Sequence, residues 1–318
     1  MIRPIFACSA AALLTIFAVA VGAEELPEGD SVEAVELFTV PSYCEGVVFD
    51  YEGNGYVSWG TTITLFTLDG QNKTWAETGA PNGHKIFRDG THGVCDASRH
   101  AVLRLSADGE LMEPWSTECN GVPLRGPNDM TRPNYGSSFY FTDPGGSDDK
   151  NLIGTVHYVE NGVTYLIDEG LAYPNGIVLS ADNTKLYVAE SKKNRVLVYD
   201  VHPNSGRHVG ERQVFAELPE KDESAGQIDN QPDGMCLDAA GNLYVAHYGM
   251  KQVQVLSPEG KLIARYPGGN VTTSNVAFGG PKLDQLFVTG GLGAEASEGG
   301  VFRLDLGVEG FGVLVNLR

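Results

Sequence analysis

The sequence predicts an all-β protein: a six-bladed β-propeller with a central channel, preceded by a cleaved signal peptide. Three observations predict this fold: a hairpin pattern that recurs along the chain, a nearly constant spacing between recurrences, and no long segment of helical periodicity after the N-terminal apolar run. Short strands repeated at such a period are typical of propellers. An open sandwich or a pair of barrels is the alternative, and the regular spacing disfavours it.

The first 23 residues have the pattern of a secretory signal peptide. Arg3 supplies an early positive charge, an apolar run follows, and the small residues Val21, Gly22 and Ala23 end it. We expect cleavage after Ala23, so that residues 24–318 form a single propeller domain in the periplasm or outside the cell. An uncleaved N-terminal anchor is the alternative. No later segment of the sequence is long and apolar enough to suggest a membrane span.

The composition narrows the classes of partner. Hydrophobic residues make up 42% of the chain and there are 40 glycines, which fits a globular fold with many turns. The net charge of −19 argues against nucleic acid and against an anionic membrane surface as partners. The same charge favours the attraction of a cation.

Four cysteines remain after the expected cleavage: Cys44, Cys95, Cys119 and Cys236. They allow three disulfide pairings, and the sequence does not choose among them. We expect Cys44, Cys95 and Cys236 to be buried strand residues, because a free cysteine packs as a small hydrophobic side chain.

The recurring hairpin consists of a short apolar strand, a turn rich in Gly, Asn, Asp or Pro, and a second strand of the type aromatic-Val-small-polar. Five hairpins begin at Glu45, Asn128, Asn175, Asp233 and Asn275, and a sixth unit, "DGTHGVCDASRHAVLRL", lacks most of its first strand. The early strand "AVELFTV" is expected to close the ring by joining the last residues, "GFGVLVNLR". Six second-strand positions lie 38 to 57 residues apart: Tyr56, Val94, Tyr140, Tyr187, Tyr244 and Phe287.

We assign four of the hairpin starts to one set of oxygen donors: Glu45, Asn128, Asn175 and Asp233. The inner strand of each blade lines the channel, so equivalent positions at its start should converge near the axis. Two carboxylates and two carboxamides suit Ca²⁺, with Mg²⁺, Mn²⁺ and Zn²⁺ as alternatives. Asn-Gly and Asp-Gly pairs are also ordinary turn residues. That competing interpretation does not explain Glu45, because glutamate is a poor turn residue.

The segments "EGVVFD", "GPNDM", "YPNGIVLSADNTKLYVAES" and "QPDGMCLDAAGNLYVAH" closely resemble the calcium-dependent six-bladed propellers of the gluconolactonase, regucalcin (senescence marker protein) and diisopropylfluorophosphatase group. The resemblance covers essentially all of residues 24–318. It implies a divalent metal held by the same four residues, and hydrolysis of lactones or related esters. One feature departs from the group: the substrate-binding arginine of regucalcin-like members is replaced by Gly126, and Arg125 lies one residue further away.

We expect water to attack a lactone carbonyl that the metal polarises. Asp233 is the catalytic candidate that orients or deprotonates this water, with a role as ligand only as the alternative. His92, in "GTHG", is a second candidate for the base or for a substrate contact, and we expect it to approach the channel mouth through the shortened second unit.

Asn275, Arg125 and His247 are candidate substrate contacts, each with a purely structural role as the alternative. The sequence has no G-x-S-x-G elbow, H-E-x-x-H pair, Walker loop or dinucleotide fingerprint. Serine-triad chemistry and nucleotide cofactors are therefore not supported.

Two other functions compete with a metal-dependent hydrolase. One is a non-catalytic propeller that binds a protein or glycan and holds a structural Ca²⁺ in its channel, because a propeller fold does not determine function. The other is a metal-free propeller enzyme of the strictosidine synthase kind, which the Glu-Asn-Asn-Asp set disfavours. The expected partner of the hydrolase is a small lactone or ester.

Overall fold

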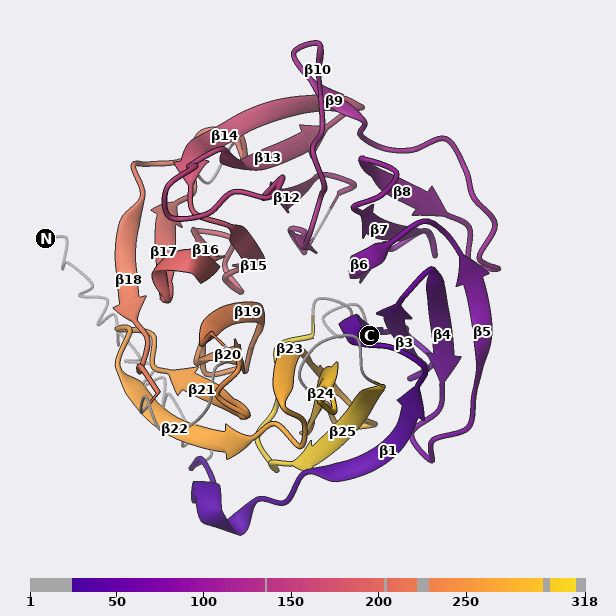
Figure 1. Ribbon diagram of the computed structural model, residues 1–318, viewed down its shortest axis with the longest axis vertical. Helices are drawn as coiled ribbons and strands as arrows, with labels where there is room; N and C mark the ends of the chain where they lie inside the picture. The colour runs from indigo at the N-terminus through magenta and orange to yellow at the C-terminus, as the bar shows by residue number, and fades with distance from the viewer. Residues whose placement is uncertain (1–24, 135, 203–204, 222–228, 294–297, 313–318) are drawn as a thin grey trace, which may run out of the picture.

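The computed structural model describes residues 25–134, 136–202, 205–221, 229–293 and 298–312, and these form six blades of antiparallel strands around a central channel (Figure 1). The all-β propeller prediction is confirmed. The only helical segments in these ranges are the single turns η1 (Gly29–Ser31) and η2 (Ser191–Lys193). No helix there has the length and hydrophobicity of a membrane-spanning segment. The expected signal peptide, residues 1–23, lies outside the described residues.

The blades follow one another along the chain, each with its first strand next to the channel (Figure 1). Blade 1 consists of β2 (Cys44–Phe49), β3 (Gly55–Trp59), β4 (Thr62–Phe66) and β5 (Asn72–Glu77). Blade 2 consists of β6 (Pro81–Ile86), β7 (His92–Asp96) and β8 (Ala101–Leu105). Blade 3 consists of β11 (Met130–Thr131), β12 (Phe139–Asp143), β13 (Gly154–Glu160) and β14 (Val163–Leu171). A small hairpin of β9 (Glu118–Cys119) and β10 (Val122–Pro123) lies between blades 2 and 3 in the chain.

Blades 4 to 6 are built in the same way. Blade 4 consists of β15 (Pro174–Leu179), β16 (Lys185–Glu190), β17 (Arg195–Asp200) and β18 (Gln213–Glu217). Blade 5 consists of β19 (Gln231–Leu237), β20 (Leu243–Tyr248), β21 (Gln252–Leu256) and β22 (Leu262–Pro267). Blade 6 consists of β23 (Thr272–Gly279), β24 (Gln285–Gly291), β25 (Gly299–Asp305) and β1 (Val35–Val40).

Blade 2 corrects one prediction. The second unit was expected to lack most of its first strand, but β6 supplies a complete inner strand from Pro81 to Ile86. The reduced strand is the outer one, of which the isolated bridges Val102–Ser116 and Leu105–Leu111 remain.

The N-terminal strand closes the ring, as predicted, but with a different partner. β1 is the outermost strand of blade 6 and pairs with β25, from Val35 opposite Arg303 to Val40 opposite Gly299. Of the expected partner, Gly310 instead pairs with Asp238 of blade 5, and residues 313–318 lie outside the described residues. The first and last described strands meet within one sheet (Figure 1).

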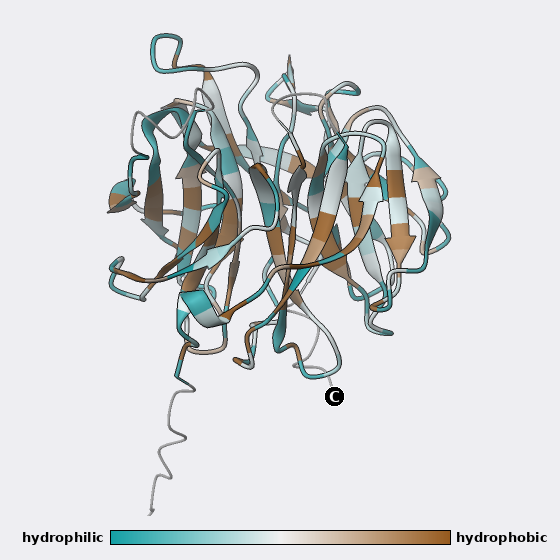
Figure 2. Cartoon of the chain, turned by 60° about the horizontal axis from the view of Figure 1, so that its bottom comes forward, coloured by the Kyte–Doolittle hydropathy of each residue, from teal (hydrophilic) through white to brown (hydrophobic). Residues whose placement is uncertain are grey.

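The hydrophobic core of the described residues is divided into clusters that lie between neighbouring blades. The recurring second-strand residues lie in these clusters: Tyr56, Val94, Tyr140, Tyr187, Tyr244 and Phe287. Hydrophobic residues follow the strands, whereas the loops at both ends are largely hydrophilic (Figure 2). The sequence repeat is thus a packing repeat, because each blade must bury both faces against its neighbours.

The cysteines also pack inside. Cys44, Cys95 and Cys119 are buried, Cys236 is partly buried, and these four described cysteines are free thiols.

Candidate metal centre

The inner strands share an irregularity near their start. In blade 4 the pairing between β15 and β16 skips from Pro174 to Ile177, and the inner strands of blades 1, 2 and 5 skip at the same point. A β-bulge of this kind bends the strand and re-aims the side chains inside it. The second residue of each of these segments is a polar residue at the channel: Glu45, Asn82, Asn175 and Asp233.

Blades 3 and 6 contribute the remaining two positions. Asn128 precedes β11, and its backbone N–H donates to the carbonyl of Thr142, 2.9 Å away. In blade 6, Val276 pairs with Val288 in the way that Ile177 pairs with Val188 in blade 4. Ser274 therefore occupies in blade 6 the position that Asn175 occupies in blade 4. We call the complete set the mouth ring: Glu45, Asn82, Asn128, Asn175, Asp233 and Ser274.

Glycine follows four members of the mouth ring because neighbouring inner strands touch there. A Cβ on Gly176 would lie 2.0 Å from the carbonyl oxygen of Asp233, and one on Gly46 would lie 2.2 Å from that of Asn82. Real Cβ atoms do not approach so closely, so only glycine allows this packing. The contacts also show that ring members of adjacent blades are neighbours in space.

The four predicted donors lie together and are nearly enclosed. Asn128, Asn175 and Asp233 are all buried. The side chain of Asn175 donates a hydrogen bond to Asp233, and the hydroxyl of Tyr43 donates one to Glu45. Two oxygens, Oε2 of Glu45 and Oδ1 of Asn128, are buried without a hydrogen-bond partner among the described residues. Leaving such atoms unsatisfied is unfavourable, so the geometry calls for an electrophilic ligand at this point.

The electrostatics point the same way. Burial raises the pKa of Glu45 to about 8, although the hydrogen bond from Tyr43 opposes the rise. Burial also raises the pKa of Asp233, and the charges of Glu45 and Asp129 raise it further. Without a counter-ion, these carboxylates repel one another in a place that water reaches poorly. A bound cation would remove both the repulsion and part of the desolvation cost.

Asp129 is a third carboxylate that sequence reasoning missed, although it directly follows Asn128. It is buried, and burial raises its pKa while the charge of Lys85 opposes the rise. When ionised, the two carboxylates among the four donors, Glu45 and Asp233, carry a charge of −2, which a single divalent cation balances, while Asp129 faces the positive charge of Lys85.

The residues present therefore fit a hard divalent cation held by mixed oxygen donors. Within the described ranges, no group of three or more His, Cys, Asp or Glu side chains is arranged to hold a metal ion. A metal here would need the carboxamide oxygens of Asn128 and Asn175 beside the carboxylates of Glu45 and Asp233.

Three tyrosines lie close to these donors, and the sequence analysis did not single them out. The rings of Tyr43 and Tyr248 meet edge to face, 6.2 Å apart. Burial, followed by the charges of Asp233 and Glu45, raises the pKa of Tyr173 to about 12. We call Tyr43, Tyr173 and Tyr248 the tyrosine rim. A signal for two of them existed, since "YCEG" and "YPNG" each place a tyrosine two residues before a donor.

Tyr173 adopts a backbone conformation that is rare for an aromatic residue, with φ of 59°. Its N–H donates to Oγ of Ser147 at 2.9 Å, and its carbonyl accepts the N–H of Ser191 at 3.0 Å. Strained residues that the surroundings fix in this way often lie at functional sites. Here the two hydrogen bonds hold the residue immediately before the Pro174-Asn175 segment.

His92 does not reach the channel mouth, so the expected approach is wrong. It pairs with Ile86, at the end of β6 opposite to Asn82. One of its nitrogens, Nδ1, lies 2.8 Å from Nε2 of His84, and its ring centroid lies 4.4 Å from that of Trp75. Burial lowers the pKa of His92 to about 4. The structure therefore gives His92 a packing position between blades 1 and 2.

The other candidates surround the centre at different depths. Asn275 lies one residue after the ring position of blade 6, packs against Gly234, and accepts the N–H of Val276 at 2.9 Å. His247 is opposite Pro232 on the second strand of blade 5, with Nε2 2.9 Å from Oδ1 of Asn194. Asn275 thus borders the four donors, whereas the imidazole of His247 faces blade 4.

Arg125 is exposed and held away from an anion-binding position. Its guanidinium donates to the carbonyl of Ile153 at 3.0 Å, and its stem packs over Gly145. Its backbone N–H and that of Gly126 donate to the buried carboxylate of Asp143, at 2.9 Å and 2.7 Å. The segment is therefore fixed by Asp143, with the Arg125 side chain directed along the surface.

Comparison with known proteins identifies the family. Residues 44–291 match the model described as "SMP-30/Gluconolactonase/LRE-like region". The chain belongs to this family. Its curated relatives include a gluconolactonase of Zymomonas mobilis, 30% identical over 65% of this chain and 60% of that protein. They also include a lactonase of Staphylococcus saprophyticus, 29% identical over 83% of each chain. The alignments span about half to four-fifths of the length of these relatives. The smallest share of the three, 53%, belongs to a pentonolactonase of Haloferax volcanii.

Solved structures of the family share the fold. A gluconolactonase of Xanthomonas campestris superposes with a TM-score of 0.73 at 22% identity, covering 88% of this chain and 91% of that one. Regucalcin of Agrobacterium tumefaciens, described as a calcium-binding protein, gives 0.70 at 21% identity, covering 88% and 96%. The resemblance to the gluconolactonase and regucalcin group is confirmed.

Proposed function

We propose that this protein is an exported hydrolase of lactones or related esters that depends on a divalent metal, Ca²⁺ before Mg²⁺, Mn²⁺ or Zn²⁺. The observation that carries the proposal is the buried set of Glu45, Asn128, Asn175 and Asp233, with two oxygens lacking a partner and a charge that a divalent ion balances. The names of the family relatives, several of them lactonases, support the same reaction class. Export rests on the pattern of residues 1–23.

Some residues of the site would hold the metal, and others orient the carboxylates that hold it. Glu45, Asn128, Asn175 and Asp233 would hold the metal, which supplies Lewis-acid polarisation of a carbonyl oxygen when bound. The Tyr43 hydroxyl fixes the carboxylate of Glu45, and the Asn175 amide fixes that of Asp233. These two carboxylates are thereby oriented before substrate arrives, which lowers the reorganisation needed in the transition state.

Asp233 is the residue we place nearest to the attacking water. Its carboxylate is already oriented by Asn175, so it can accept a hydrogen bond from a water molecule and direct that water at the carbonyl carbon. His92 has no part in this step, because it lies at the opposite end of β6. The tyrosine rim lies beside the donors, so its hydroxyls are placed to contact a substrate bound there.

The test is hydrolysis of a panel of small lactones and esters by the purified mature protein, followed by proton release, with Ca²⁺ present and then removed by a chelator. We expect turnover that the chelator abolishes and added Ca²⁺ restores. Turnover that persists in excess chelator would contradict the metal-dependent mechanism.

The competing function is a binding module in which Ca²⁺ is purely structural. The buried donor set and the closed strand contacts are equally compatible with a metal that only joins the blades. Absence of turnover with every metal tried, in protein shown by calorimetry to be folded and metal-loaded, would favour this alternative.

A further inference from the structure

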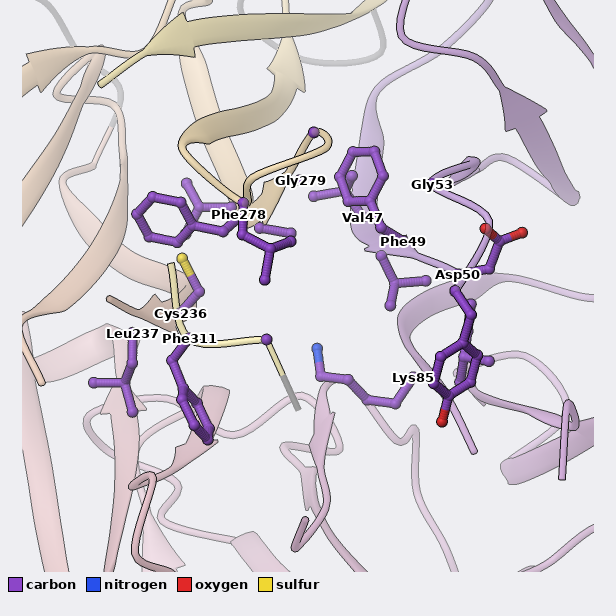
Figure 3. A pocket seen from close by; sticks show the side chains of 18 of the residues that line it. Val47, Phe49, Asp50, Gly53, Lys85, Cys236, Leu237, Phe278, Gly279 and Phe311 are labelled. Carbon is purple, nitrogen blue, oxygen red and sulfur yellow. The ribbon is translucent and has the colours of Figure 1, made fainter. Parts of the chain in front are cut away.

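A second space opens at the end of the channel opposite to the mouth ring. The far halves of the six inner strands enclose a cavity of about 1110 Å³ (Figure 3). Small-molecule sites usually measure about 300–1,000 Å³, so there is room for an organic ligand. We call this space the channel chamber. It is separate from the candidate metal centre, because its walls come from residues after the donor positions of each strand.

The chamber has a ring of its own, three residues after each member of the mouth ring. We call it the chamber ring, and its members are Val48, Lys85, Thr131, Val178, Cys236 and Ala277. Five of the six are uncharged, and the walls beside them include Phe49, Leu237 and Phe278. The lining also includes charged residues: Asp50, Glu52, Arg88, Arg132, Lys282 and Glu309. The chamber therefore offers both apolar and charged groups to an organic ligand.

Lys85 is the exception in this ring. Its amine reaches into the open space of the chamber, across from Cys236, Leu237 and Phe311 (Figure 3). Among the hydrogen bonds and ion pairs of the described residues, none involves that amine. Its charge is felt at Asp129, where it opposes the burial-induced rise in pKa. A lysine placed among apolar groups is unfavourable unless an anion accompanies it.

We propose that the channel chamber binds an amphiphilic monocarboxylate, with its carboxylate on the Lys85 amine and its alkyl chain against Val48, Val178 and Ala277. A single negative charge fits better than a phosphate dianion, because the Lys85 amine is the cation of the chamber ring and the carboxylates of Asp50, Glu52 and Glu309 line the same cavity. The two rings thus select ligands of opposite charge within one channel.

The test is isothermal titration of the metal-loaded protein with sodium decanoate below its micelle concentration. We expect one molecule to bind per chain, and Lys85→Met to weaken binding at least tenfold while keeping the length of the side chain. Ala277→Phe should also weaken binding, because it fills the chamber and leaves the charge in place. Lys261→Met, at an exposed position outside the chamber lining, is the matched control and should bind within twofold of wild type.

A second measurement does not depend on variants. Decanoate should protect the Lys85 amine from reductive methylation, read by peptide mass spectrometry, and leave Lys261 equally reactive. Failure of the wild-type protein to bind decanoate, or equal binding by Lys85→Met, would overturn the proposal. Equal binding by that variant would instead place the carboxylate on the metal, so the result separates this proposal from the proposed hydrolase function.

Discussion

The mouth ring and the chamber ring are built from the same six strands, three residues apart, and differ in almost every property. Five members of the mouth ring are carboxylates or carboxamides, and Ser274 is the sixth. Only Lys85 in the chamber ring is charged, and its charge is positive. Bulges and glycines repeat from blade to blade, whereas the ring side chains do not. The repeated bulges and glycines therefore determine the backbone scaffold, and the individual side chains at the ring positions determine the chemistry.

The largest effect is expected from Asp233→Asn, which removes one of two carboxylates from the candidate metal centre. We expect the affinity for Ca²⁺ to fall at least a hundredfold, measured by calorimetric titration, and lactone hydrolysis to fall with it. The metal-free protein should unfold at a higher temperature than wild type, because a repulsive buried charge is gone. Unchanged Ca²⁺ affinity would show that Asp233 is not a ligand.

The next effect tests the close contact between blades. Gly176→Ala would place a Cβ 2.0 Å from the Asp233 carbonyl oxygen, so the inner strands of blades 4 and 5 must separate. We expect a loss of about 1–3 kcal/mol in the free energy of unfolding, typical of overpacking, measured by urea denaturation.

Gly210→Ala is the matched control for that substitution. Its nearest atom would lie at an ordinary 3.5 Å, so stability should hardly change. Equal effects of the two substitutions would contradict the role of Gly176 in bringing the mouth ring together.

An intermediate effect is expected on the pH dependence of folding stability, through His92, which lies away from the channel mouth. His92 has a folded-state pKa of about 4, and it faces His84 and the charge of Asp50. The unfolded chain takes up a proton near pH 6.5 and the folded chain does not, so stability falls as pH drops from 6.5 to 4. The difference amounts to at most about 3 kcal/mol.

His92→Gln should flatten this dependence, at the cost of some packing against Trp75. Urea denaturation of both proteins at pH 7 and pH 4.5 measures it. A variant that loses as much stability as wild type between these two pH values would show that His92 is not responsible.

The smallest effect couples the two rings. Lys85→Met removes a positive charge that opposes the pKa rise of Asp129, next to the donor Asn128. We expect the Ca²⁺ affinity to increase by about two- to tenfold at low ionic strength, because a like charge no longer repels the ion, and the increase to shrink at high salt. A decrease in affinity would mean that the rings are linked through structure rather than charge.

The blades were predictable from the sequence because one position per repeat is an aromatic or aliphatic residue buried between blades, from Tyr56 to Phe287. Glu45, Asn128, Asn175 and Asp233 were predictable as a group because they begin equivalent strands. Whether they hold a metal stays a prediction.

Blade 2 was misinterpreted because "PNGHKI" places His84 and Lys85 where other inner strands are apolar, so β6 lacked the expected pattern. The Pro-Asn-Gly segment repeated at residues 81–83 and 174–176 was the missed signal. The wrong position for His92 followed from the same error. Asp129 and the chamber ring were not predictable, because the sequence pattern does not show which other side chains of each inner strand turn toward the channel axis.

The pairing of β1 with β25 has a consequence for how the molecule is made. Among the described strands, β1 is the first to leave the ribosome and its partner β25 is the last. Until β25 appears, β1 lacks the neighbour with which it pairs in blade 6. The ring can therefore close only after the strands of all six blades have been synthesised, and this order makes circular closure a late step in folding.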